Sequence, residues 1–143
     1  MPYTNKKMKK LIIGLGEVLW DVLPEGKKLG GAPANFAYFT QQFGNDAIAV
    51  SAIGNDDLGG ETIEALNSNG LKYITTRVNI PTERVSVMHN DKGVQTYTAN
   101  EGVAWCHIPC TAEMEKHAGK CDAVCWERSA QRSETSPQHM RKV

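Results

Sequence analysis

Apolar runs and amphipathic stretches alternate over the first half of the chain. Residues 11–15 and 47–53 are short and almost wholly apolar, which is typical of strands buried on both faces of a sheet. Residues 32–43 and 57–69 instead carry apolar side chains at helical spacing, and a glycine follows each stretch. Strand, helix, strand and helix in this order predict an α/β fold, built on a parallel sheet with right-handed crossovers.

The second half of the chain has a different pattern. Two extended stretches with alternating valines flank residues 90–93, Asn-Asp-Lys-Gly, and together they predict a β-hairpin. Residues 17–23 also have an extended pattern, and Pro-Glu-Gly at 24–26 turns the chain after them. Residues 111–120 predict a further helix, and residues 122–126 predict a buried strand.

The helix predicted over residues 32–43 carries three phenylalanines, Phe36, Phe39 and Phe43. Their spacing of three and four residues places them on one face of a helix. We therefore expect this face to pack against the core.

The turn before this helix has the composition of a ligand-binding segment. Gly30 and Gly31 let a ligand approach the backbone closely, and either residue can adopt a positive φ. Pro33 fits the first helical turn, where no N–H is needed. Asn35 offers two donors and an acceptor to a hydroxylated ligand near the N–H groups of the helix start. The alternative is a strand-to-helix turn with a cap and no ligand.

The wider pattern resembles a known family. Gly-Gly-x-Pro-x-Asn-x-Ala at 30–37 is followed by Gly44 and Gly54 at the spacing of the N-terminal signature of ribokinase-like (pfkB) carbohydrate kinases. The segments 14–21, Gly-Leu-Gly-Glu-Val-Leu-Trp-Asp, and 51–59, Ser-Ala-Ile-Gly-Asn-Asp-Asp-Leu-Gly, are similar to the fructokinase-like branch. The resemblance extends from about residue 11 to about residue 125.

The resemblance implies a ribokinase-like fold: a parallel sheet with flanking helices and a small β-sheet lid over the sugar. Residues 18–29 and 84–98 are the candidate lid strands, although an ordinary surface hairpin would have the same pattern. Residues 1–126 would form the N-terminal part of a kinase domain, truncated before its C-terminal half. The implied function is sugar binding within an ATP-dependent carbohydrate kinase that phosphorylates a sugar hydroxyl.

Asp21 is the candidate partner of the glycine turn. It closes an extended stretch, and its carboxylate can accept hydrogen bonds from two neighbouring sugar hydroxyls. With Gly30, Gly31 and Asn35 it would complete a clamp for a polyol, as the resemblance implies. The alternative is a turn aspartate before Leu23-Pro24. Fructose is the expected sugar because the residues of these motifs resemble those of the fructokinase-like branch. Ribose, another ketose and a sugar acid are alternative substrates.

The groups that would transfer the phosphoryl group are not found in this sequence. It contains neither a Gly-x-x-x-x-Gly-Lys-[Ser/Thr] loop nor a Gly-x-Gly-Asp segment. In the family, the catalytic aspartate and the ATP pocket belong to the second half of a chain about twice this length. Asp56 and Asp57 fit a helix cap, and Glu101 is a loop residue. We therefore name no catalytic residue, and we do not expect ATP or Mg²⁺ to bind this chain well.

Composition and charge exclude several classes of protein. Lysine plus arginine and aspartate plus glutamate are 16 each, so no net charge favours nucleic acid or an anionic membrane. No apolar run approaches membrane-spanning length. The lysines at 6–10 precede a short apolar run that acidic residues interrupt, which argues against a signal peptide. We expect a cytoplasmic protein.

Four cysteines raise the question of a zinc site. Cys106 and Cys110 form one pair, and Cys121 and Cys125 form another, with two histidines nearby. If residues 121–125 form a strand, the two sulfurs lie roughly 13 Å apart at ~3.3 Å per residue, too far to share one metal. Small buried thiols in a reducing compartment are the favoured interpretation.

Residues 127–143 are nearly devoid of large apolar side chains, so we expect a frayed or disordered tail.

Half of a parallel sheet would leave an edge strand and an apolar face uncovered. We therefore expect poor solubility and self-association, or a homodimer through the lid. Two alternatives to the kinase portion stay open: an inactive sugar-binding or interaction fragment, and the remnant of an interrupted kinase gene.

Overall fold

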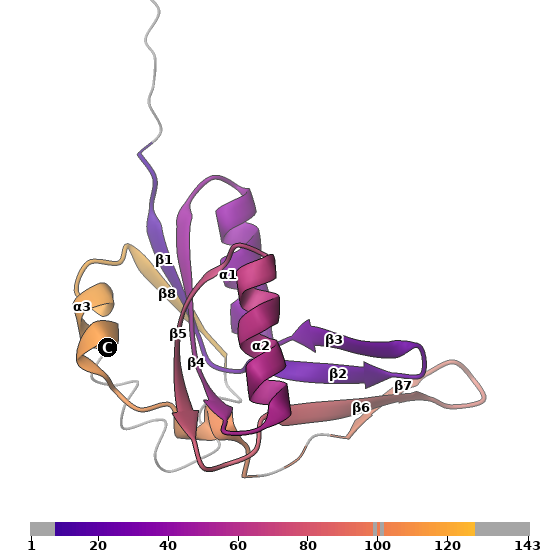
Figure 1. Ribbon diagram of the computed structural model, residues 1–143. Helices are drawn as coiled ribbons and strands as arrows, with labels where there is room; N and C mark the ends of the chain where they lie inside the picture. Colours follow the sequence, from indigo (N-terminus) through magenta and orange to yellow (C-terminus); the bar gives the residue numbers. More distant parts are fainter. Residues whose placement is uncertain (1–7, 99, 101, 128–143) are drawn as a thin grey trace, which may run out of the picture.

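The computed structural model describes residues 8–98, 100 and 102–127, and this part of the chain forms two separate sheets (Figure 1). The larger sheet is parallel throughout, as the order of elements predicts. Its strands, in spatial order, are β5 (Lys72–Val78), β4 (Asp46–Gly54), β1 (Leu11–Leu15) and β8 (Ala123–Trp126). The helical elements of the described part are α1 (Ala32–Gln42), α2 (Asp57–Ser68), α3 (Ala112–Ala118) and the 3₁₀ turn η1 (Ala104–His107).

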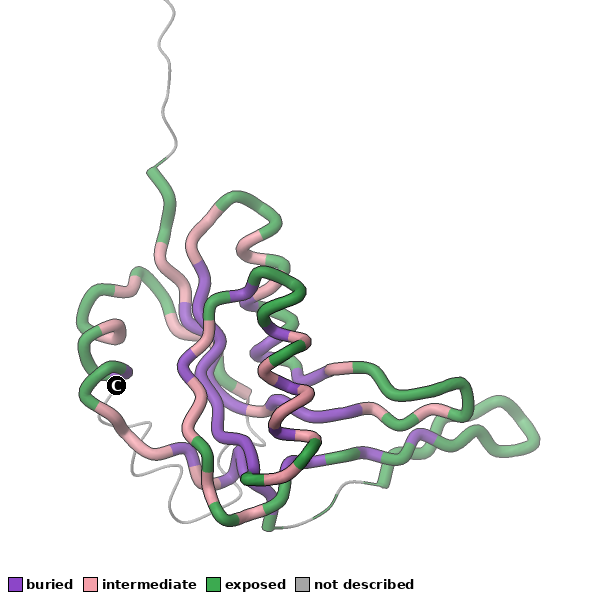
Figure 2. Tube along the Cα trace, in the orientation of Figure 1, coloured by how far each residue is buried: buried purple, intermediate pink, exposed green. Residues whose placement is uncertain are grey.

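The parallel sheet is covered on both faces, and this is where the core lies (Figure 2). Every residue of β4 after Asp46 is buried, which confirms the apolar run as an interior strand. Alternate residues of β1 and β4, including Ile13 and Val50, pack with Met114 of α3. The opposite face, including Ala47 and Ala49, packs under α1 and α2.

Helix α1 packs against the sheet by its small residues, and the expectation that its phenylalanine face forms the core is wrong. Pro33, Ala34 and Ala37 are buried, whereas Phe36, Phe39 and Phe43 are 42%, 58% and 79% exposed. The cause is the close approach of α1 to β1. A Cβ added to Gly14 would lie 2.1 Å from the carbonyl oxygen of Pro33, so only small side chains fit between helix and strand.

The second sheet consists of two hairpins placed side by side. In spatial order its strands are β3 (Gly26–Gly30), β2 (Leu19–Leu23), β6 (Glu83–His89) and β7 (Gln95–Thr98), and we call this unit the small sheet. Strands β2 and β3 are antiparallel, β6 and β7 are antiparallel, and β2 runs parallel to β6. The turn at residues 90–93 closes the second hairpin as predicted, with Asn90 N–H donating to the Val94 carbonyl at 3.0 Å. The small sheet projects away from the parallel sheet (Figure 1).

Two elements have no counterpart among the sequence predictions, and one differs from its prediction. Strand β5 and the turn η1, whose Trp105 is completely buried, were not expected from the pattern. Strand β8 is an edge strand of the described sheet rather than a buried one, and its Trp126 is 54% exposed.

Among the described residues, no helix is both long and apolar enough to cross a membrane.

Candidate functional site

The glycine pair between β3 and α1 is held by two close contacts. Gly31 has φ = 112°, a left-handed conformation, and a Cβ there would lie 2.3 Å from the Glu17 carbonyl oxygen. A Cβ on Gly30 would lie 2.6 Å from Oδ2 of Asp21. Gly31 therefore requires glycine, and the contact at Gly30 shows that the Asp21 carboxylate lies directly over the glycine turn.

Asp21 is positioned by strand pairing rather than by a polar partner. It pairs with Lys28 of β3 and with Val85 of β6, which places it in the middle of the small sheet. Its carboxylate forms no hydrogen bond or ion pair with another residue of the described ranges. Partial burial, with nothing donating to the carboxylate, raises the pKa of Asp21 above its ordinary value. A half-buried carboxylate with free acceptor positions suits a ligand that brings hydroxyl donors.

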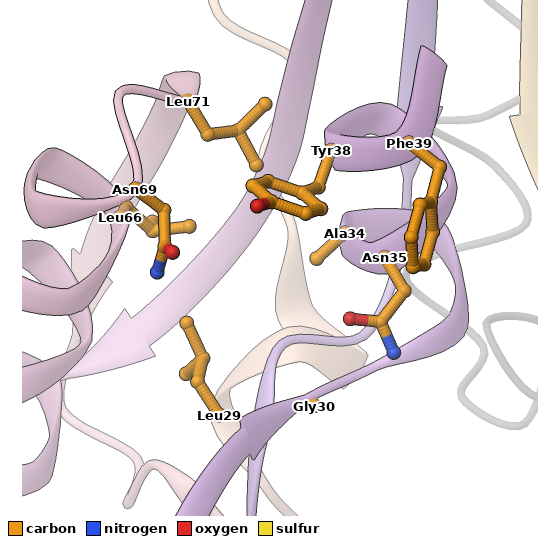
Figure 3. A pocket seen from close by; sticks show the side chains of 9 residues that line it. All are labelled: Leu29, Gly30, Ala34, Asn35, Tyr38, Phe39, Leu66, Asn69 and Leu71. Atoms are coloured by element: carbon orange, nitrogen blue, oxygen red, sulfur yellow. The ribbon is translucent and has the colours of Figure 1, made fainter. Parts of the chain in front are cut away.

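Asn35 lies in the first turn of α1 and its side chain is exposed. It lines a groove of about 240 Å³ between α1 and the end of α2, together with Tyr38 and Asn69 (Figure 3). Leu29 also lines this groove, and because it precedes Gly30 it faces the opposite side of the small sheet from Asp21. Of the four sequence-predicted residues, the structure brings together Asp21, Gly30 and Gly31, and Asn35 lines a groove to which Gly30 also contributes.

The N-terminus of α1 is partly satisfied by a side chain that the sequence analysis did not assign. Glu17 Oε1 accepts a hydrogen bond from the Ala32 N–H at 3.2 Å. A carboxylate at this end of a helix is favoured by the helix dipole. Pro33 has no N–H to offer. The helix start therefore offers fewer free N–H groups to a ligand than the sequence alone indicates. The sequence feature that could have indicated this contact is Glu17 in the Gly-Glu segment at 16–17.

Asp56, rather than Asp57, caps α2, and it also contacts the chain that enters β6. Its carboxylate accepts hydrogen bonds from the Gly59 N–H at 2.8 Å, the Thr82 N–H at 2.8 Å and the Thr82 hydroxyl at 2.7 Å. The Thr82 hydroxyl in turn accepts from the Gly54 N–H at 2.9 Å. Partial desolvation acts to raise the pKa of Asp56, but these hydrogen bonds outweigh it and hold the pKa below its ordinary value.

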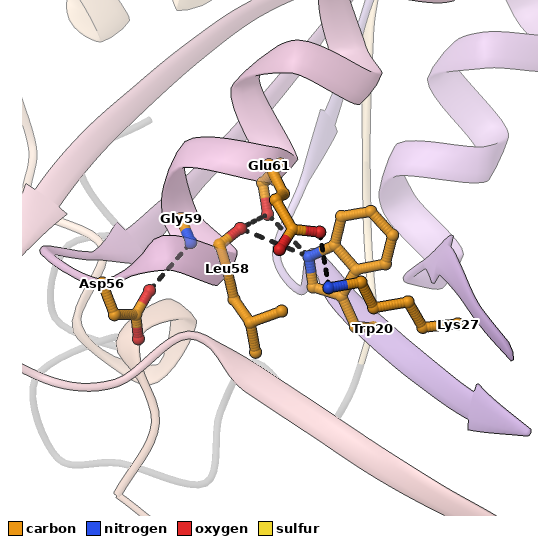
Figure 4. A network of polar contacts seen from close by, with 7 residues as sticks. Trp20, Lys27, Asp56, Leu58, Gly59 and Glu61 are labelled. Carbon is orange, nitrogen blue, oxygen red and sulfur yellow. Dashed lines mark hydrogen bonds and ion pairs between the residues drawn. The ribbon is translucent and has the colours of Figure 1, made fainter.

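A second set of polar contacts joins the small sheet to α2 (Figure 4). The indole N–H of Trp20 donates to the Thr62 hydroxyl at 3.0 Å and approaches the Leu58 carbonyl at 3.3 Å. Lys27 of β3 forms an ion pair with Glu61 at 2.5 Å, and its ammonium lies 5.3 Å from the Trp20 ring centroid. Trp20 thus turns toward α2, on the face of β2 opposite Asp21.

The other acidic and thiol groups do not form a metal or acid–base site in the described part. Glu83, at the start of β6, is buried and accepts a hydrogen bond from the buried indole of Trp105. No group of three or more His, Cys, Asp or Glu side chains that could hold a metal occurs among the described residues. None of the four cysteines, all of which lie in the described part, forms a disulfide bond. Glu101 and the tail at 128–143 lie outside the described residues, so the predictions made for them are not tested.

The fold and the glycine turn define a class: an α/β protein whose parallel sheet carries a small second sheet beside a helix start. Solved sugar kinases share this fold. A sugar kinase of Pyrococcus horikoshii, described as uncharacterized, matches with a TM-score of 0.77 and 20% identity over 92% of this chain and 49% of its own. The fructokinase of Xylella fastidiosa matches with a TM-score of 0.76 and 19% identity, over 94% of this chain and 47% of its own. The fructokinase of Halothermothrix orenii matches with a TM-score of 0.78 and 14% identity, over 92% and 51%.

These matches confirm the ribokinase-like fold class, and the chain spans about half the length of the structures it matches. The sequence profile of the pfkB family carbohydrate kinases matches residues 16–134. The chain belongs to this family. The profile match confirms the family resemblance inferred from the glycine motifs. Comparison with curated protein sequences gives no match.

Proposed function

We propose that this chain binds a sugar at Asp21 and the adjoining glycine pair, as the sugar-binding portion of a carbohydrate kinase. The observation that carries the proposal is the Asp21 carboxylate, which lies directly over Gly30 and has no partner among the described residues. A carboxylate with free acceptor positions accepts and orients hydroxyl groups without requiring a charged ligand. In this proposal the small sheet is a lid, since it carries Asp21 and projects beyond the parallel sheet.

Asn35 has a secondary role in this proposal. It follows Gly31 by one helical turn, with its backbone N–H bonded to the Gly31 carbonyl at 2.9 Å. Its amide makes no hydrogen bond with another described residue, so it is free to contact a ligand that extends across the glycine turn. We therefore expect the loss of Asn35 to weaken sugar binding less than the loss of Asp21.

Isothermal titration calorimetry tests the proposal. Fructose and ribose are titrated into the wild-type chain, Asp21→Ala and Asn35→Ala, with Asp91→Ala, an exposed turn aspartate, as the matched control. Loss of a charged hydrogen-bond acceptor costs about 1.5–3 kcal/mol, so Asp21→Ala should weaken binding by about tenfold to a hundredfold. Equal affinity of Asp21→Ala and Asp91→Ala would overturn the role of Asp21.

Fructose is the proposed sugar, and two fructokinases are among the structural neighbours, although their identity to this chain is below 20%. The experiment separates this part of the proposal from the site itself. Preference for fructose over ribose supports the fructokinase-like branch, whereas equal or reversed affinities would leave the site standing and overturn the sugar assignment.

The whole kinase would use ATP as phosphoryl donor with Mg²⁺, and a related sugar kinase from Pyrococcus horikoshii was solved in complex with ATP. We assign no residue of the described part of this chain to the nucleotide or to the metal. We therefore propose that the chain by itself has little or no kinase activity. ATP-dependent phosphorylation of fructose at a rate typical of kinases, roughly 1–100 s⁻¹, by the purified chain would overturn this proposal.

Two further properties belong to the same proposal. Cysteines without disulfide bonds are typical of a reducing compartment, and we place the protein in the cytoplasm. We also propose that the chain associates with itself. The candidate surfaces are the phenylalanine face of α1 and the exposed side of the small sheet, which includes Met88.

A further inference from the structure

The small sheet buries only part of its residues, and its buried apolar side chains are Leu19, Trp20, Val85 and Val87. All residues of β7 are exposed, and in β6 buried and exposed side chains alternate. Hairpins with one wet face depend on packing against another element for their stability. The question is which element supports the small sheet, because that element also places the strand that carries Asp21.

We call a hydrogen-bonded contact that joins the small sheet to α2 a fixed point. The first is made by the indole of Trp20, which is next to Asp21 in β2. Its N–H donates to the hydroxyl of Thr62, which is fully buried within α2, while that hydroxyl donates to the Leu58 carbonyl at 2.7 Å. The Thr62 hydroxyl is thus both donor and acceptor, and its direction is fixed by the helix itself. The Lys27–Glu61 ion pair lies over the same indole, but it is half exposed and contributes little.

The second fixed point lies where the chain enters the other hairpin. Thr82 immediately precedes β6, is buried, and gives both its N–H and its hydroxyl to the Asp56 carboxylate at the start of α2. Because β2 and β6 are neighbours in register, with Leu19 opposite Glu83, the two fixed points hold adjacent strands. Both reach the same helix.

We propose that α2 is the support of the small sheet, and that Trp20 and Asp56 are positioning residues that hold the strand of Asp21 over the glycine turn. The role of Asp21 in this statement rests on the proposed sugar site, whereas the anchoring itself does not. Each anchor is a hydrogen-bonded contact that can be removed without changing the shape of the side chain.

Hydrogen exchange of backbone amides tests the anchoring in the absence of sugar. Thr62→Val and Thr82→Val each delete one anchoring hydroxyl, and Thr111→Val is the matched control, since it deletes the hydroxyl that caps α3. One hydrogen bond of about 1 kcal/mol corresponds to about a fivefold change in a local opening equilibrium. We expect about fivefold faster exchange in β2, β3 and β6 of the two test variants, and unchanged exchange in β1 and in β4 apart from Gly54, whose N–H donates to the Thr82 hydroxyl. The control should accelerate exchange in α3 alone.

Two results would overturn the anchoring. Rates in the small sheet that match the wild type in both test variants would show that α2 does not hold it. Equal acceleration in β1 and β4 would show a general loss of stability instead. Trp20→Phe removes the N–H donor together with the five-membered ring of the indole, so it should accelerate exchange in the small sheet at least as much as Thr62→Val, and wild-type rates would again contradict the proposal.

A fructose titration then tests the positioning of Asp21. If the wild-type chain binds fructose, Thr62→Val and Thr82→Val should bind it several-fold more weakly, whereas the control Thr111→Val should bind it as the wild type does. Wild-type affinity in both variants would overturn the positioning role. If the wild-type chain does not bind fructose, the proposed sugar site fails, whereas the exchange result still decides whether α2 anchors the small sheet.

Discussion

The two sheets of this molecule are stabilised in different ways. In the parallel sheet, eight successive residues of β4 are buried, and helices cover both faces. In the small sheet, β6 alternates buried and exposed residues, and β7 is exposed along its whole length. Burial of apolar surface therefore dominates the first sheet. In the second sheet fewer side chains are buried, among them Val85 and Val87, and hydrogen bonds made by Trp20 and Thr82 join it to α2.

This difference has a consequence for the site. Gly31 is the N-cap of α1, which packs tightly on the parallel sheet, whereas Gly30 and Asp21 belong to the small sheet. The site therefore lies where the two units meet, and its carboxylate is held by the weaker one. Elements that move on ligand binding are drawn from the less stable parts of proteins. The following variants test the contrast, from the largest expected effect to the smallest.

Gly14→Ala should have the largest effect, because its Cβ would lie 2.1 Å from the Pro33 carbonyl oxygen and separate α1 from β1. We expect a loss of at least about 3 kcal/mol in the free energy of unfolding, measured by urea denaturation. Gly60→Ala is the matched control in α2, where nothing lies within 4 Å of the added Cβ. It should stabilise the chain by about 0.5–1 kcal/mol. A similar result for both variants would contradict the close packing of α1.

Asp56→Ala should cost about 2 kcal/mol at neutral pH, since it removes a helix cap and the contact with Thr82. The pKa of Asp56 is below its ordinary value in the folded state, so its contribution is present above about pH 3.8 and is lost as the pH falls through the folded pKa. Urea denaturation of the wild type and variant should therefore converge at low pH. Asp57→Ala, at the exposed neighbouring position, should change stability by less than about 0.5 kcal/mol. A pH-independent cost of Asp56→Ala would argue against the hydrogen-bonded carboxylate.

The phenylalanine face of α1 is the surface that we expect to mediate self-association. Replacing Phe39 and Phe43 together by Gln should raise the dissociation constant measured by sedimentation at least tenfold, because about 1.4 kcal/mol of apolar burial is lost. Met88→Gln on the small sheet is the comparison, with a similarly exposed apolar side chain. If Met88→Gln weakens association and the phenylalanine variant does not, the small sheet is the interface instead.

Asp21→Asn should have the smallest effect on stability. Whether the variant is more or less stable than the wild type is the informative result. Burial raises the pKa of Asp21 above its ordinary value, so the folded state loses stability as the pH rises through that pKa. The neutral amide avoids this loss. We expect the melting temperature of Asp21→Asn to equal or exceed that of the wild type at pH 7, and the difference to disappear at low pH. A clear decrease at pH 7 would show that the carboxylate stabilises the fold.

The sequence predicted what depends on local pattern. The apolar runs of β1 and β4, the hairpin turn at 90–93 and the glycine pair were all recognised, because each has a local physical cause. Strand β5 was missed since its residues, Lys-Tyr-Ile-Thr-Thr-Arg-Val, show no clear apolar period, and pairing with β4 determines its conformation.

Tertiary contacts account for the other differences. The phenylalanine spacing identified a helix face correctly, but the approach of Gly14 to Pro33 selected the alanine face for packing. The contact between Asp56 and Thr82 joins residues 26 positions apart, and the contact between Trp20 and Thr62 joins residues 42 positions apart. Neither is visible in a local pattern, so the support of the small sheet emerged only from the structure.

The most direct test of the sugar site is an NMR titration of the chain with fructose, in which backbone amide shifts are followed. The account predicts that Gly30 and Gly31 shift first, with Asp21 and its neighbours in β2, and that Asp21→Asn reduces all of these shifts together. Shifts that fall elsewhere, for example in the groove residues Tyr38 and Asn69, and persist in Asp21→Asn would contradict it.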